Sequence, residues 1–254
     1  MKKILFILPS LNGGGAERVA VNYIRSLNSK KYEIILAVLH VTEDLLGLIP
    51  EHVKIVDLNT LKTSKSFWKI LKITSTQKPD FIFTTHSRLA SVVSLTKLFL
   101  RNFKHIARMQ NMPSLEVANE RYGFMEQKLY SIAFRKADTV IAQTVEMKKD
   151  AVNFFRVKKN KVIVMNNPLD TENILNSLKS AVTPFEIKEI DAVASGRISK
   201  QKGYDTLIRS IPKIVKLRPK FKLHFLGRDK GEKENLVALS EDLGISKHIE
   251  FHGH

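Results

Sequence analysis

The chain has 254 residues, a length that suits two ordinary domains, and 43% of them are hydrophobic, which is enough to form buried cores. It contains no cysteine, which excludes disulfides, a thiolate nucleophile and a cysteine metal site, and which suits a cytoplasmic protein. Lysine and arginine outnumber aspartate and glutamate by 42 to 25. The resulting net charge of +17 favours an anionic partner such as nucleic acid, an acidic membrane surface or a phosphorylated substrate.

The N-terminal residues, MKKILFILPSL, combine two lysines with an apolar run, as a signal peptide does. The run from Ile4 to Leu8 is short, Pro9 ends it, and no cleavage site of small residues follows. We therefore interpret it as the first buried strand of a parallel sheet. No apolar stretch reaches the ~20 residues that a membrane-spanning helix needs.

Apolar runs typical of strands alternate with helical patterns through the first two-thirds of the chain. A helix is expected over Ala16–Leu27, for example, because its apolar residues recur at helical spacing. Continuous apolar strands with helical connections predict a doubly wound α/β domain with a parallel sheet. The predicted strands are Lys3–Leu8, Ile34–Leu39, Lys54–Leu58, Phe81–Thr84, His105–Arg108, Thr139–Ala142 and Val162–Met165.

A second and shorter series of the same kind follows. Its predicted strands are Asp191–Ser195, Lys222–Leu226 and Ile249–Phe251, with a helix after each of the first two, the second over Lys233–Leu243. We predict a first domain over residues 1–165, a connection over 166–186 and a second domain over 187–254. Three strands and two helices make about half of a doubly wound domain, so the second domain is expected to be incomplete.

The stretch from Ala194 to Val215 carries the strongest signal for a ligand site. Gly196, Arg197, Lys202 and Gly203 lie between a predicted strand and an amphipathic helix. The free N–H groups and the dipole of a helix N-terminus attract anions. The sequence therefore predicts a phosphate site, to which Arg197 and Lys202 add full positive charges.

A glycine-rich loop, NGGGAER, joins the first predicted strand to the first predicted helix. It contains Gly13, Gly14, Gly15 and Glu17. Its glycines allow a ligand to approach the backbone closely, next to a helix N-terminus. It is not a dinucleotide fingerprint, because Arg18 replaces the third glycine. The alternative is an ordinary tight turn whose charged side chains are solvated.

These patterns together resemble the family-4 glycosyltransferases of the GT-B fold, which include the bacterial group 1 glycosyltransferases. The Gly-Arg…Lys-Gly-x-Asp pattern from Gly196 resembles their diphosphate-binding motif, NGGGAER resembles their Gly-Gly-x-Glu loop, and KADTVIAQT (136–144) resembles their Ala-Asp-x-Val-Ile strand. The resemblance implies two Rossmann-like domains and the transfer of a sugar, with retention of configuration, from a nucleotide diphosphate sugar to an acceptor.

The resemblance also assigns roles to individual residues. Arg197 and Lys202 would hold the donor diphosphate, with Gly196 and Gly227 beside the donor. His86, just after a predicted strand, would lie near the reacting sugar, and the Gly13–Glu17 loop and Arg108 would face the acceptor. The alternatives are a surface histidine at position 86 and, for Arg108, a loop packed on the domain.

The sequence departs from the family pattern in three places. Asn167-Pro168-Leu169 replaces the usual Gly-Val, and Arg228-Asp229-Lys230 displaces the second glycine after Gly227, which puts the geometry around the base in question. The Glu…Glu motif that contacts the donor sugar and ribose is not found, because the resemblance covers about the first two-thirds of a family member. We therefore keep a shortened, non-catalytic nucleotide- or glycan-binding protein as an alternative to the enzyme.

The expected partners are a nucleotide sugar, a glycan or lipid-linked acceptor and an anionic membrane surface. Two stretches, Leu61–Thr74 around Trp68 and Leu95–Ile106, mix lysines with aromatic residues, as interfacial helices do. An ordinary helix with a solvated lysine face is the alternative. Cell-envelope glycan synthesis at the cytoplasmic face of the plasma membrane would suit this charge.

Other ligand classes find less support. No zinc finger or RNP aromatic pair supports nucleic acid as a partner, although a basic nucleic-acid-binding protein would fit the charge. The histidines show no spacing typical of a metal site, and no metal cofactor is expected.

Overall fold

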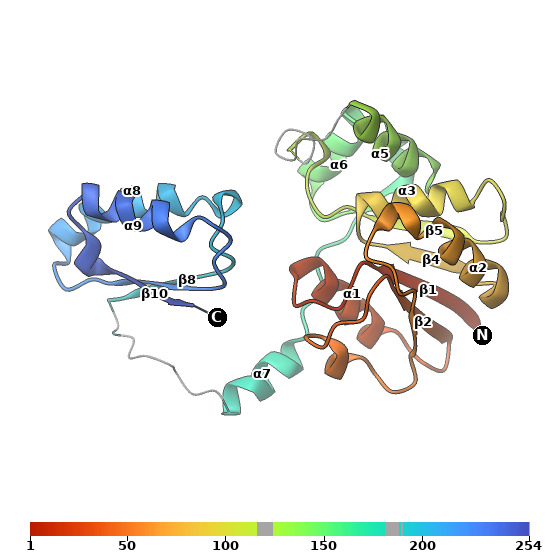
Figure 1. The fold of residues 1–254 in the computed structure, drawn as a ribbon, viewed down its shortest axis with the longest axis horizontal. Helices are drawn as coiled ribbons and strands as arrows, with labels where there is room; N and C mark the ends of the chain where they lie inside the picture. Colours follow the sequence, from red (N-terminus) through yellow and green to blue (C-terminus); the bar gives the residue numbers. More distant parts are fainter. Residues whose placement is uncertain (116–123, 181–187, 189, 254) are drawn as a thin grey trace. The chain divides into compact units, whose positions relative to one another are not determined.

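A computed structural model describes residues 1–115, 124–180, 188 and 190–253 (Figure 1). The chain divides into two compact units, unit 1 (Met1–Asn176) and unit 2 (Ser177–His254). The division falls within the predicted connection 166–186, and part of this connection is a helix, α7 (Thr171–Ser180).

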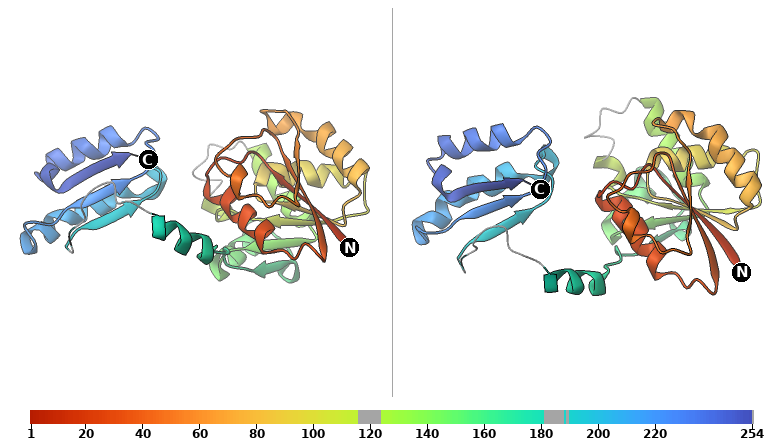
Figure 2. Two further views of the ribbon diagram at one scale, coloured as in Figure 1. Left: turned by 90° about the horizontal axis from the view of Figure 1, so that it is seen from below. Right: turned by 60° about the horizontal axis from the view of Figure 1, so that its bottom comes forward.

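Unit 1 is built on a parallel sheet of seven strands, in the order β3-β2-β1-β4-β5-β6-β7. The strands are β1 (Lys2–Leu8), β2 (Tyr32–Val38), β3 (Lys54–Asp57), β4 (Phe81–Thr84), β5 (Lys104–Arg108), β6 (Thr139–Ala142) and β7 (Val162–Val164). The strands fan out relative to one another (Figure 2), as the twist of a parallel sheet requires. All seven strands of the first predicted series are confirmed.

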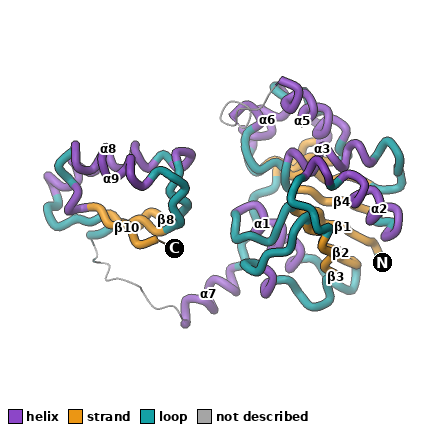
Figure 3. The backbone as a smooth tube through the Cα atoms, viewed as in Figure 1, coloured by secondary structure: helices purple, strands orange, loops and turns teal. Residues whose placement is uncertain are grey.

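Helices cover both faces of this sheet, which explains why its strands are apolar without alternation. They are α1 (Gly15–Ser26), α2 (Phe67–Gln77), α3 (Ser87–Thr96), α5 (Phe124–Lys136) and α6 (Val145–Asn153). Phe6 and Leu8 of β1 pack with α1, whereas Leu5 and Ile7 point to the opposite face and pack with α2 and α3. Figure 3 shows these helices around the strands. The predicted doubly wound α/β architecture is therefore correct.

One polar pair lies inside the unit 1 sheet. Thr84 Oγ1 of β4 and His105 Nε2 of β5 are 3.0 Å apart, and both side chains are fully buried. Burial, together with the nearby Lys97 ammonium, lowers the pKa of His105 from its usual 6.5 to about 3. The imidazole is therefore neutral at physiological pH.

Unit 2 contains a smaller parallel sheet of three strands, in the order β10-β9-β8. Its elements are β8 (Ala192–Ser195), α8 (Tyr204–Leu217), β9 (Leu223–Leu226), α9 (Lys233–Asp242) and β10 (Ile249–Gly253). Both helices lie over the same face of the sheet (Figure 1), and the stacked rings of Phe225 and Phe251, 4.9 Å apart, belong to the core beneath them. The second predicted series of strands is confirmed as well.

Candidate functional site

The strand order of unit 1 reverses between β1 and β4, because β2 and β3 follow on one side of β1 and β4 to β7 on the other. In open α/β sheets, ligands bind outside the carboxyl ends of the strands at such a switch point. The glycine loop follows β1, and His86 follows β4. The fold therefore brings these two sequence-predicted elements to one place.

Glu17 and His86 meet there. Glu17 Oε1 lies 3.4 Å from His86 Nε2, and Thr85 Oγ1 lies 2.9 Å from the other ring nitrogen. Both side chains keep contact with solvent, with 12% of Glu17 and 27% of His86 exposed. A Cβ at Gly14 would stand 2.4 Å from Glu17 Oε2, so the glycine leaves room for this carboxylate to fold over the loop. The result is a partly exposed carboxylate and imidazole, a pair that can hydrogen-bond sugar hydroxyls.

Arg108 lies at the end of β5, but in the interior rather than at an exposed edge. Only 2% of the residue is exposed, and its Nη2 donates to Asn167 Oδ1. Asn167 Nδ2 donates to Gln143 Oε1 at 3.2 Å, and the Gln143 amide in turn donates to the carbonyl oxygens of Met109 and Gln110. Burial lowers the pKa of Arg108 below its usual value. In this arrangement Arg108 positions the chain segment around Asn167.

Unit 2 provides the second glycine loop, after β8. Gly196 has a φ of 145° and Gly227, after β9, a φ of 151°, values that disfavour any residue with a Cβ. A Cβ at Gly227 would lie 2.0 Å from the carbonyl oxygen of Gly196, so the two loops pack backbone against backbone. Ile198 N–H donates to Arg228 O at 3.0 Å and Lys230 N–H to Ile198 O at 2.8 Å, which extends this pairing beyond the strands.

The two sequence-predicted cations lie on this loop. Arg197 and Lys202 are exposed, and neither forms an ion pair with a residue that the structure describes. A Cβ at Gly196 would be 3.6 Å from Lys202 Nζ, so the ammonium lies over the loop backbone. Helix α8 begins directly after Gly203, and no described side chain caps it. Exposed cations beside a helix N-terminus without a side-chain cap are the kind of groups with which proteins bind anions.

Sequence reasoning missed several residues around these sites. The hydrogen bonds from Arg108 to Asn167 and from Asn167 to Gln143 were not predicted, because they depend on the alignment of three strand ends. Tyr204 is the first residue of α8, and its hydroxyl would lie 3.0 Å from a Cβ at Gly196. Burial raises the pKa of its phenol above the usual value.

The two sheets and their glycine loops define an α/β protein of the GT-B glycosyltransferase class. Residues 13–173 match the family described as Glycosyltransferase Family 4, and residues 176–254 match the family Glycosyl transferases group 1. The chain therefore belongs to the family-4 glycosyltransferases. None of the described helices is both long and apolar enough to cross a membrane.

Two relatives show how far the likeness extends. An uncharacterised glycosyltransferase of Methanocaldococcus jannaschii is 30% identical over 199 residues, which are 74% of this chain and 48% of the relative. A Campylobacter jejuni enzyme, N-acetylgalactosamine-N,N'-diacetylbacillosaminyl-diphospho-undecaprenol 4-alpha-N-acetylgalactosaminyltransferase, is 26% identical over 98% of this chain and 68% of its own. The chain thus spans about half of the first relative and two-thirds of the second.

Solved structures agree on the fold. Anabaena HepE in complex with UDP superimposes with a TM-score of 0.72 at 17% identity, covering 100% of this chain and 69% of HepE. WaaG, a glycosyltransferase involved in lipopolysaccharide biosynthesis, gives a TM-score of 0.67 at 14% identity, covering 98% of this chain and 70% of WaaG.

Proposed function

We propose that this protein transfers a sugar, with retention of configuration, from a nucleotide diphosphate sugar to a lipid-linked acceptor in cell-envelope glycan synthesis. The observation that carries the proposal is the unit 2 loop, where the exposed cations Arg197 and Lys202 stand beside the uncapped start of α8. A nucleoside diphosphate is a small, highly charged anion, and this loop offers charge and backbone donors together.

The proposed chemistry needs positive charge next to the leaving group, the nucleoside diphosphate. As the glycosidic bond breaks, negative charge grows on the distal phosphate of the nucleoside diphosphate. Arg197 can form two parallel hydrogen bonds to phosphate oxygens, and Lys202 supplies a point charge above Gly196. These groups would stabilise the leaving group without requiring a metal ion at that position.

The acceptor side is proposed to be the unit 1 cluster of Glu17 and His86. A carboxylate accepts hydrogen bonds from hydroxyl groups, and an imidazole can donate or accept one. The Campylobacter relative is named for a sugar acceptor on diphospho-undecaprenol, and HepE has also been solved with UDP and glucose. These names support a nucleotide sugar as donor and a lipid-linked glycan as acceptor.

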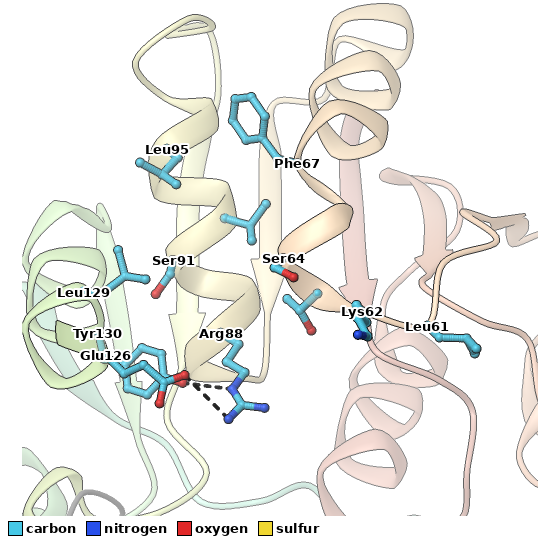
Figure 4. A pocket seen from close by; sticks show the side chains of 12 residues that line it. Leu61, Lys62, Ser64, Phe67, Arg88, Ser91, Leu95, Glu126, Leu129 and Tyr130 are labelled. Atoms are coloured by element: carbon cyan, nitrogen blue, oxygen red, sulfur yellow. Dashed lines mark hydrogen bonds and ion pairs between the residues drawn. The ribbon is translucent and has the colours of Figure 1, made fainter. Parts of the chain in front are cut away.

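A peripheral membrane surface on unit 1 is part of the proposal. A groove of about 620 Å³ lies between α2, α3 and α5 (Figure 4), with Phe67, Leu95 and Leu129 among its lining residues and an Arg88–Glu126 ion pair of 3.7 Å at one end. Phe67 contacts the rings of Trp68, which is 71% exposed, and Phe99, which is 63% exposed. Exposed aromatic residues of this kind, near lysines, suit the headgroup region of an anionic bilayer.

One lysine of the predicted interfacial stretch Leu61–Thr74 is bound to the backbone of unit 1. The Lys69 ammonium donates to the carbonyl oxygens of Leu58 and Asn59, at 2.6 and 2.7 Å, so it serves the fold. Lys62, Lys65 and Lys72 are exposed and remain the cations proposed to face the lipid.

Calorimetric titration with UDP, GDP and ADP tests the central proposal. We expect one saturable site per chain for at least one of them, with binding weakened by inorganic diphosphate because the phosphates supply the contacts. Absence of binding for all three would contradict the proposed donor site in this chain.

Flotation with vesicles tests the membrane proposal separately. We expect binding to anionic but not neutral vesicles, weakened at high salt because exposed charges are then screened. The double variant Trp68→Ala with Phe99→Ala should bind less, whereas Leu217→Ala, which removes an exposed apolar side chain of unit 2, should not. Equal binding to neutral and anionic vesicles would contradict an electrostatic anchor.

A further inference from the structure

Unit 2 holds a cluster of metal-ligating side chains that the glycosyltransferase site does not use. His224 of β9 and Glu250 of β10 are partners in the strand register, and His252 lies two residues further along β10. All three project from the face of the sheet opposite α8 and α9, because they alternate with the core residues Phe225 and Phe251. Their ligand atoms lie within 4.8 Å of one another.

The distances within the cluster match those of a tetrahedral metal site. His224 Nδ1 is 2.9 Å from His252 Nε2 and 3.5 Å from Glu250 Oε2, and His252 Nε2 is 3.6 Å from the same oxygen. Tetrahedral bonds of about 2.0–2.1 Å to zinc place neighbouring ligand atoms roughly 3.3–3.4 Å apart. The three atoms therefore need shifts of only a few tenths of an ångström to surround one ion.

A fourth side chain orients the buried histidine. The Asp191 Oδ2 atom lies 3.5 Å from His224 Nε2, the ring nitrogen that points away from the cluster, and the side chains of both residues are 2% exposed. The backbone N–H groups of Lys188 and Lys222 hold the Asp191 carboxylate at 2.9 and 3.1 Å. A carboxylate behind a ligating histidine fixes the tautomer in which the other ring nitrogen can bind a metal.

The charges around the cluster can also accommodate a cation. Lys222 pairs with Glu250 Oε1, which leaves Oε2 directed toward the two histidines. Asp191 and Glu250 carry two negative charges against the one positive charge of Lys222. A divalent ion would therefore meet a local excess of negative charge rather than a repulsive site.

We propose that His224, Glu250 and His252 bind a divalent transition-metal ion of the zinc type, with a fourth position left for water. Two imidazole nitrogens and one carboxylate oxygen are a donor set that zinc accepts readily. The ion would link β9 to β10 near the ends of these strands, where Gly227 N–H donates a hydrogen bond to Gly253 O. Binding at this cluster would be independent of sugar transfer.

Zinc binding to the full chain, stripped first with a chelator, tests the proposal. We expect one zinc per chain by elemental analysis, and an affinity that falls at least about 100-fold in His252→Ala and in Glu250→Gln because each loses a direct ligand. Asp191→Asn should weaken binding by about 10- to 100-fold, the usual effect of losing a residue that orients a ligand. His52→Ala, which removes an exposed histidine of unit 1, should leave the affinity unchanged.

A second measurement does not depend on how well a variant folds. In wild-type protein, the histidine ring signals in NMR spectra should shift for His224 and His252 at one equivalent of zinc, and those of His40 and His52 should not. The proposal is overturned if wild-type protein takes up no zinc at one equivalent, if folded His252→Ala binds as tightly as wild type, or if the shifted signals belong to other histidines.

Discussion

The two glycine loops follow the first strand of their respective sheets, yet the charged groups above them are opposite. In unit 1 the Glu17 carboxylate folds over Gly14 and meets His86, whereas in unit 2 the Lys202 ammonium lies over Gly196. A glycine turn at a strand end only opens space for a ligand. We infer that the side chain closing over the turn selects the ligand, hydroxyl groups beside a carboxylate and phosphates beside an ammonium.

The loops also differ in how tightly their glycines are packed, and this difference predicts the largest effect. Gly227→Ala would place a Cβ 2.0 Å from backbone oxygen at a φ of 151°, and we expect it to destabilise unit 2 by about 3 kcal/mol or more. Gly14→Ala has an ordinary φ of −68° and displaces only the flexible end of Glu17, so we expect less than about 1 kcal/mol. Urea denaturation measures both.

Gly231→Ala is a control for the backbone angle alone, because Gly231 has a φ of 88° and a Cβ added there would meet no described atom within 4 Å. It should cost roughly 1–2 kcal/mol, the usual penalty for a left-handed residue. Similar losses of stability in Gly227→Ala and Gly14→Ala would show that the two loops tolerate an added Cβ equally well, which would contradict this prediction.

The next effect concerns the ligand. Arg197→Ala and Lys202→Ala should each weaken nucleoside diphosphate binding about ten- to a hundred-fold, since a charge-assisted hydrogen bond contributes ~1.5–3 kcal/mol. Lys216→Ala removes an exposed lysine from α8 and should change the affinity only a few-fold, because it alters only the overall electrostatic field of the protein. Calorimetry gives the affinities, and an equal loss in the control would place the site elsewhere.

The smallest effect is expected in unit 1. Glu17→Gln removes the charge beside His86, and a partly exposed pair of this kind contributes roughly 0–1 kcal/mol to stability. Nucleoside diphosphate affinity should stay within about twofold, because the proposed phosphate site belongs to unit 2. A tenfold drop in that affinity would mean that the two loops do not divide the donor and the acceptor between them.

Features carried by one continuous stretch could be predicted from the sequence. The strands were predictable because a sheet covered on both faces demands unbroken apolar runs. The place of the second glycine loop was predictable because a strand, a loop and a helix N-terminus follow one another along the chain. This loop contains Gly196, Arg197 and Lys202. The roles of these residues, of His86 and of the first glycine loop in transfer stay predictions until the assays above are made.

Features that join distant stretches could not be predicted. Arg108 was expected to face the acceptor, but its hydrogen bond to Asn167 forms only because the ends of β5 and β7 align. His224 and Glu250 are neighbours only because of the register between β9 and β10, which no spacing in the sequence reveals. Likewise, the sequence does not reveal that the Lys69 ammonium donates to the carbonyl oxygens of Leu58 and Asn59.

The buried pair of Thr84 and His105 gives unit 1 a sensitivity to acid. Because the pKa of His105 is about 3 in the folded protein and about 6.5 in an unfolded chain, the unfolded state takes up a proton first as the pH falls. Stability should therefore decline below pH 6.5, by about 2 kcal/mol at pH 5, and level off only near pH 3. Asp138 acts in the same direction: burial alone would raise its pKa, but Lys97 and the His105 N–H outweigh burial and lower it. Acidification thus protonates Asp138 and removes its stabilising negative charge from the folded protein. It also protonates His105 in the unfolded chain, which favours unfolding.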